Sequence, residues 1–142
     1  PALYVSNRRG VYLPVLRSAL YEVFAIFDFA DPSTIQGRRQ TTTVAPQALF
    51  MMNSELMTQA SRLLAERVVR ESERDVERIR TAYRLIHLRM PTHDESERVM
   101  RFLERYANAV EEPQHGVEKQ PLLSWQALCR VLLSSNEFVY IT

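Results

Sequence analysis

From Leu56 almost to the C-terminus, apolar residues recur at intervals of three and four, the spacing that lines one face of an α-helix. Four such runs follow one another along the chain: Leu56, Ala60, Leu63, Leu64 and Val68; Val76, Ile79, Tyr83 and Ile86; Val99, Phe102, Leu103, Tyr106 and Val110; and Trp125, Leu128, Val131 and Leu132. The pattern predicts an all-α fold. We expect an irregular bundle of five or six helices.

The two ends of the chain depart from this helical pattern. Pro14 lacks an amide donor and restricts the residue before it, so residues 1–15 are predicted to form an extended arm. A short first helix is expected over Leu16–Phe27. A last helix is predicted around residues 124–134, and the short apolar segment 138–141 is expected to be an extended tail.

Two capping signals frame the helices in the middle of the chain. Ser72 with Asp75, and Thr92 with Glu95, match the spacing of a capping box, in which each side chain accepts from a backbone amide of the first turn. Pro91 ends the first of the two helices. Because the connection between them is short, we expect the two helices to pack as an antiparallel hairpin.

Length and charge limit the kinds of protein that the sequence can encode. With 142 residues, of which 46% are hydrophobic, residues 1–142 are expected to form a single helical domain with a real core. The formal net charge is only +1, which argues against nucleic acid as a partner. No apolar run reaches the length of a membrane span, so none is expected.

The sequence offers no ligand set for a metal or cofactor. His87, His93 and His115 are not spaced as a helical pair of zinc ligands, and Cys129 is the single cysteine. Cys129 lies among the apolar residues of the last helix, so it is expected to be a buried, inert thiol. We predict no metal site and no cofactor in this domain.

Candidate contact residues gather in the N-terminal third, where the block Arg8–Arg17 and the loop of residues 37–39 have neither a helical nor an alternating period. They are five arginines, two amides, one tyrosine and one aspartate: Arg8, Arg9, Arg17, Arg38, Arg39, Gln47, Asn53, Tyr12 and Asp28. They could hold an anionic or sugar-like ligand, because arginine presents a planar fork of donors and amides supply both donors and acceptors. They could equally be structural, with Arg17 paired to Asp28 or Asp31 and with Asn53 or Ser54 as a helix cap.

Several of these residues belong to segments that resemble a known family. The segments are Arg9–Val15, Phe27-Asp28 with Asp31-Pro32, Arg38-Arg39, Thr42–Asn53 and Ser135–Tyr140. Together they resemble the Planctomycete-specific C-terminal domain of unknown function. The resemblance implies the last domain of a large exported, periplasmic multidomain protein that often carries a c-type cytochrome domain, and it supplies no catalytic residues.

Two functions of different classes follow from these observations. The first is a non-catalytic interaction module, in which the helices from Leu56 onward form a scaffold and residues 8–53 dock on upstream domains of the same polypeptide. The alternative is part of an enzyme that acts on carbohydrate or an anionic substrate with an upstream haem domain. In that case Arg9, Arg39 and Gln47 would orient the substrate. Glycosidase chemistry would need two facing carboxylates, for which Asp28 and Asp31 are the candidates in this region.

Overall fold

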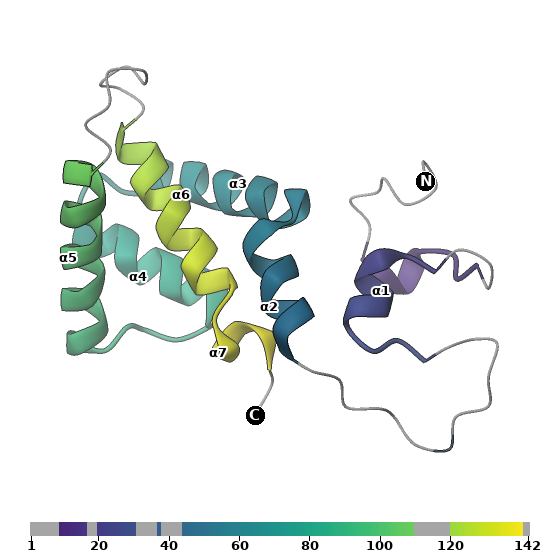
Figure 1. The fold of residues 1–142 in the computed structure, drawn as a ribbon. Coiled ribbons are helices and arrows are strands. Elements are labelled where there is room, and N and C mark those ends of the chain that lie inside the picture. Colours follow the sequence, from purple (N-terminus) through teal and green to yellow (C-terminus); the bar gives the residue numbers. More distant parts are fainter. Residues whose placement is uncertain (1–8, 17–19, 31–36, 38–43, 110–119, 141–142) are drawn as a thin grey trace. The chain divides into compact units, whose positions relative to one another are not determined.

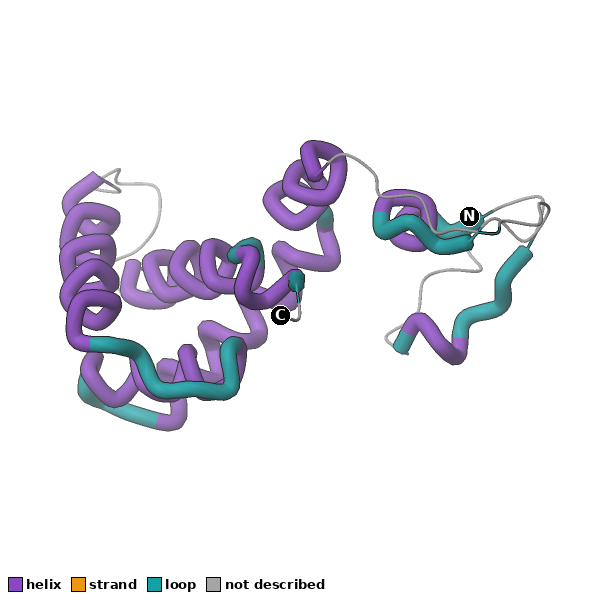
Figure 2. Tube along the Cα trace, turned by 90° about the horizontal axis from the view of Figure 1, so that it is seen from below, coloured by secondary structure: helices purple, strands orange, loops and turns teal. Residues whose placement is uncertain are grey.

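The computed structural model describes residues 9–16, 20–30, 37, 44–109 and 120–140. The all-α prediction is confirmed, since these residues form helices and loops and contain no strand (Figure 2). A 3-10 turn at Gly10–Tyr12 precedes the α-helices, which are α1 Glu22–Ile26, α2 Val44–Asn53, α3 Glu55–Glu71, α4 Asp75–Ile86, α5 His93–Ala109, α6 Gln120–Leu133 and α7 Asn136–Val139 (Figure 1). Within the described ranges, none of these helices is both long and apolar enough to cross a membrane.

The chain divides into two compact units, residues 1–50 and 51–142. The boundary falls inside α2. The first unit holds the 3-10 turn, α1 and the first part of α2, while the second holds α3 to α7. The described candidate residues from Arg9 to Gln47 therefore belong to the first unit.

Helix α6 is the centre of the second unit, because it contacts α3, α4, α5 and α7 (Figure 1). Its buried side chains are Trp125, Leu128, Cys129, Leu132 and Leu133. The prediction that Val131 would share this face is wrong: Val131 is 58% exposed, and Cys129 is fully buried in its stead. The expectation of a buried cysteine is confirmed.

Small side chains set the buried face of α3. Ser61 and Ala65 are completely buried, together with Val68, and α3 makes its most extensive contact with α6. Leu56 and Leu63 were expected on this face and are instead exposed. Small residues allow two helix backbones to approach closely, so the larger leucines point elsewhere.

Two of the capping predictions are confirmed, the Ser54 cap and the capping box of Thr92 and Glu95, and one is wrong. Ser54 caps α3, with its hydroxyl accepting a hydrogen bond from the amide of Met57 at 3.3 Å. The predicted box at Ser72 and Asp75 does not form, because the N-cap residue of α4 is Arg74 and no side chain caps it. Arg78 engages the segment instead: its Nε donates to the Ser72 carbonyl at 2.7 Å and its Nη1 to Asp75 at 2.9 Å.

The C-terminal segment was expected to be extended, and this prediction is wrong for the residues that the structure describes. Asn136–Val139 forms the short helix α7. Ser135 is its N-cap, and the Ser135 hydroxyl accepts from the amide of Phe138 at 3.4 Å. A cap that follows α6 directly allows one more helical turn, which an apolar pattern of four residues does not reveal.

Two further predictions need correction. Helix α1 is shorter than expected, since it begins at Glu22, and residues 17–19 of the predicted helix lie outside the described ranges. Helices α4 and α5 do contact one another, but in Figure 1 they cross and do not run side by side as a hairpin. The described part of the N-terminal arm, residues 9–16, contains the 3-10 turn within otherwise non-helical chain.

Candidate functional site

The structure describes five of the nine candidate residues. Arg8, Arg17, Arg38 and Arg39 lie outside the described ranges, as does Asp31. The described ones are Arg9, Tyr12, Asp28, Gln47 and Asn53. The first four belong to the unit of residues 1–50, and Asn53 is the last residue of α2.

A tight turn holds Arg9 and Tyr12. The amide of Tyr12 donates to the Arg9 carbonyl at 2.9 Å, and the amide of Leu13 donates to the Gly10 carbonyl at 3.1 Å. Gly10 packs against the ring of Phe24, where an added Cβ would lie only 3.1 Å from the ring carbon Cε1. A larger residue at position 10 would therefore require the Phe24 ring or the turn to shift by a few tenths of an ångström.

Aromatic side chains form the support beneath this turn. The Phe24 ring stacks on Phe29 with 4.9 Å between ring centroids, and the Tyr21 ring meets Phe24 edge-on at 5.5 Å. Such offset and edge-to-face pairs add about 0.5–1.5 kcal/mol each beyond the area they bury. The turn thus rests on a small aromatic cluster centred on Phe24.

The side chains at the top of the turn face solvent. Val11 is 83% exposed and Tyr12 is 70% exposed, and Val15 and Leu16 are exposed as well. Single exposed apolar residues are ordinary on a protein surface, whereas a group of them marks a contact surface. This arrangement suits binding by packing, with the tyrosine hydroxyl available for one hydrogen bond.

Asp28 has a structural role at the end of α1. Its φ angle is 57°, in the left-handed region where glycine, asparagine and aspartate are tolerated best. The amide of Phe29 donates back to the Phe24 carbonyl at 2.8 Å, and the two rings stack. This six-to-one bond with its apolar contact is a Schellman motif, so Asp28 occupies the position that ends the helix.

Gln47 also serves the fold of the first unit. It is 8% exposed, and its side-chain amide nitrogen donates to the carbonyl of Ile26, the last residue of α1, at 3.1 Å. This bond satisfies one of the carbonyls that every helix end leaves without an intrahelical partner. Asn53 is exposed at the end of α2. Of the two residues predicted as alternatives for the N-cap of α3, Ser54 is the one that caps the helix.

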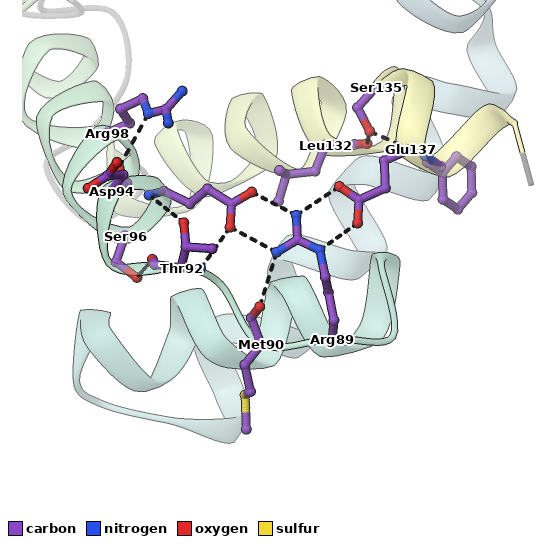
Figure 3. Close-up of polar contacts among 11 residues, drawn as sticks. Arg89, Met90, Thr92, Asp94, Ser96, Arg98, Leu132, Ser135 and Glu137 are labelled. Carbon is purple, nitrogen blue, oxygen red and sulfur yellow. Dashed lines mark hydrogen bonds and ion pairs between the residues drawn. The ribbon is translucent and has the colours of Figure 1, made fainter. Parts of the chain in front are cut away.

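Elsewhere in the described chain, a polar network surrounds Arg89 in the connection between α4 and α5 (Figure 3). Its Nη1 and Nη2 donate to Glu95 at 2.8 and 2.7 Å, and its Nε and Nη2 donate to Glu137 at 2.6 and 2.8 Å. Its guanidinium also lies over the ring of Tyr83, 5.5 Å from the ring centroid. One side chain thereby joins α4, α5 and α7.

Sequence reasoning missed this network and found only one part of it, the capping box. The amide of Thr92 donates to Glu95 Oε2 at 2.7 Å, and the amide of Glu95 donates to the Thr92 hydroxyl at 3.2 Å. The box orients the Glu95 carboxylate, whose oxygens also receive Arg89. Glu137 is 48 residues away from Arg89, so no local pattern could have paired them.

The charges of the network perturb one another strongly. Hydrogen bonds from Arg89, with smaller contributions from Thr92, lower the pKa of Glu95 to about 2. The same guanidinium lowers the pKa of Glu137, and the two carboxylates raise the pKa of Arg89. All three groups therefore stay charged at neutral pH, which suits a permanent clamp better than proton transfer.

Among the residues that the structure describes, the other reactive side chains form no catalytic or metal centre. Burial raises the pKa of the Cys129 thiol to about 12, so the thiolate nucleophile is absent at neutral pH. Within the described ranges, no three histidine, cysteine or acidic side chains come together as metal ligands. His87 is half-buried with its ring against Tyr83, and its Nδ1 has no hydrogen-bond partner.

Comparison with known proteins gives a family. The chain matches the PSD1 family, described as a protein of unknown function (DUF1553), over residues 3–103, and it belongs to that family. No curated protein and no solved structure matches the chain. The match confirms a resemblance to a domain of unknown function, while the planctomycete restriction and the cytochrome association stay predictions.

Proposed function

We propose that this PSD1-family chain is a non-catalytic interaction module that docks on other domains of the same, exported polypeptide. The observation that carries the proposal is the turn at Gly10–Tyr12, which presents Val11 and Tyr12 to solvent at 83% and 70% exposure. Folding alone does not account for two large apolar side chains at the top of a turn. A partner that covers them would recover their hydrophobic free energy, about 25 cal/mol for each Å² of apolar area.

The support beneath the turn strengthens this proposal. Gly10 lies on the Phe24 ring, and the rings of Tyr21 and Phe29 pack on the same phenylalanine. Interfaces gain affinity when their contact residues are held in place before binding, because less conformational entropy is lost. Tyrosine is also among the residues that contribute most to binding free energy at interfaces.

The alternative, part of an enzyme acting on carbohydrate or an anionic substrate, gains less support. Gln47 was the amide proposed to orient a substrate, and its nitrogen donates to the Ile26 carbonyl. Asp28 was one of two candidate carboxylates, and it sits at the left-handed position that ends α1. A thermal-shift panel of glycans and organic anions tests this alternative directly: a stabilising ligand would favour it.

Binding in trans tests the docking proposal. The 142-residue chain would be titrated by calorimetry with the preceding domains of its own reading frame, and Tyr12→Ser and Val11→Ser would be compared with the native chain. We expect each substitution to weaken binding about tenfold, since a buried tyrosine or valine contributes at least about 1.4 kcal/mol. Val131→Ser is the matched control, because Val131 is an apolar residue of similar exposure in the other unit.

Two results would contradict the proposal. One is the absence of any binding by the native chain. The other is equal binding by the native chain and by the Tyr12 and Val11 variants, provided that their circular dichroism spectra show unchanged helix content.

A further inference from the structure

A second surface lies in the unit of residues 51–142, on α4, α5 and their connection. The helices border a groove of about 850 Å³. Its apolar lining consists of Val76 from α4, Met90 and Pro91 from the connection, and Met100 from α5, and Arg80 and Arg101 line it as well. Val76 and Met90 are 45% and 57% exposed, so the groove is open to solvent.

The connection beside the groove contains an unexplained leucine. Leu88 has a φ angle of 58° and is 87% exposed. It follows His87, the C-cap residue of α4, at the position where helices usually end in glycine because a Cβ is disfavoured in the left-handed region. Neither backbone conformation nor burial favours leucine here, and such outliers often mark functional positions.

Charge on the neighbouring face of α5 points to the chemistry of a partner. Arg98, Arg101 and Arg105 border a smaller hollow of about 190 Å³ next to Phe102, and Arg101 is shared with the groove. Arg98 and Arg101 donate through Nε to the carbonyls of residues 94 and 97 on their own helix, at 3.3 and 3.4 Å.

None of these three arginines forms an ion pair with a residue of the described segments. Five other arginines of the same unit do, including Arg80 of the groove lining: Arg62, Arg67, Arg78, Arg80 and Arg89. The acid nearest to Arg101 in the groove lining, Glu97, lies 3.2 Å from His93 Nε2. Guanidinium groups without a carboxylate partner are available to an acidic ligand, which they bind with two parallel hydrogen bonds.

The Arg89 network holds this surface in shape without occupying it. The guanidinium of Arg89 turns toward Glu95 and Glu137, while the thioether of Met90 points away from that network (Figure 3). Arg89 Nη1 also donates to the Met90 carbonyl at 3.1 Å. The backbone of the connection is therefore fixed, and the Met90 side chain remains on the side of the groove.

We propose that this α4–α5 groove binds an apolar segment of a protein partner whose flanking acidic side chains pair with Arg101 and its neighbours on α5. The open groove suits a peptide segment, and Met90 and Met100 are flexible, polarisable side chains that adapt to apolar partners of different shape. Leu88, two residues before Met90 in the same connection, offers a further exposed apolar side chain. This surface belongs to a different unit from the Gly10–Tyr12 turn, so the two proposals can fail separately.

Peptide selection provides the first test. A random peptide library would be selected on the immobilised 142-residue chain, and bound peptides would be assigned by the amide shifts of Val76, Met90 and Met100. We expect the selected peptides to combine apolar residues with Asp or Glu. Failure to enrich any peptide, enrichment of basic peptides, or shifts confined to other surfaces would overturn the proposal.

A double-mutant cycle tests the charge pairing. Arg101→Gln should raise the dissociation constant of a selected peptide about tenfold. Arg70→Gln, which replaces an exposed arginine on α3, should leave it unchanged. Replacing the acidic residue of the peptide by its amide should weaken binding to the native chain and have little further effect on Arg101→Gln. Additive losses would overturn the pairing.

Leu88→Gly separates a binding role from a structural one. We expect this substitution to leave the urea midpoint unchanged or raise it, because glycine tolerates the left-handed region, while peptide affinity falls at least threefold. A lower midpoint with unchanged affinity would mean that Leu88 serves the fold, against the proposal.

Sedimentation equilibrium completes the test. A dimer abolished by Met90→Glu would identify a second copy of the chain as the occupant of the groove and overturn the proposal.

Discussion

Glu95 gives the sharpest test of what holds α4, α5 and α7 together. Its carboxylate accepts two hydrogen bonds from Arg89 and also closes the capping box with Thr92. Glu95→Gln isolates the first interaction from the second, because glutamine also serves at this position of a capping box. The substitution therefore removes the charge that faces Arg89 and keeps the cap.

The pKa of Glu95 sets the size of the expected loss. Its fall from the usual 4.5 to about 2 corresponds to roughly 3.4 kcal/mol, at 1.36 kcal/mol for each unit. Solvent screening reduces this value, since the side chains of Arg89 and Glu95 are 37% and 24% exposed. We expect Glu95→Gln to lower the free energy of unfolding by about 1.5 kcal/mol at pH 7.

The pH dependence follows from the direction of the shift. A carboxyl group whose pKa is lower in the folded state stabilises the protein fully above its unfolded pKa, and this contribution disappears as the pH falls through the folded pKa. For Glu95 the window runs from about pH 4.5 down to about pH 2. The difference between the native chain and Glu95→Gln should shrink across that window.

Urea unfolding followed by the fluorescence of Trp125 measures this difference, because the single tryptophan is 2% exposed in the same unit. Glu71→Gln is the control, since Glu71 forms an exposed helical pair with Arg67 and should cost less. A loss at Glu95 no larger than that at Glu71, or one that stays constant from pH 5 to pH 2, would refute the reasoning.

Three further substitutions or modifications have defined outcomes. Ser54→Ala should lower the free energy of unfolding by about 1 kcal/mol in urea titrations, whereas Ser72→Ala, which removes no cap, should have almost no effect; equal losses would contradict the assigned caps. Asp28→Val should speed hydrogen exchange of the Phe29 amide about tenfold while Asp28→Gly should not, because the left-handed position disfavours a branched side chain; identical exchange would exclude the motif. Cys129 should react with a thiol reagent only after urea unfolding, and fast labelling of the native chain would show that it is accessible.

The candidate site shows how far residue type alone can lead. Arg9 and Tyr12 lie at the 3-10 turn, Asp28 follows α1, and Gln47 lies within α2. In the structure Gln47 and Asp28 serve the end of α1, and Tyr12 is left facing solvent. The choice between contact residue and structural residue depended on hydrogen bonds that only coordinates display.

The sequence by itself determined the all-α fold, the capping box of Thr92 and Glu95, and a cap at Asn53 or Ser54, because helical periodicity and capping act over three or four residues. Only the tertiary structure decided that Ser61 and Ala65, and not the leucines of α3, face α6, and that Arg89 joins Glu137 to Glu95. The first outcome depends on how closely two helices pack, which side-chain volumes on both helices set. The second depends on partners up to 48 residues apart, which no local sequence pattern can pair.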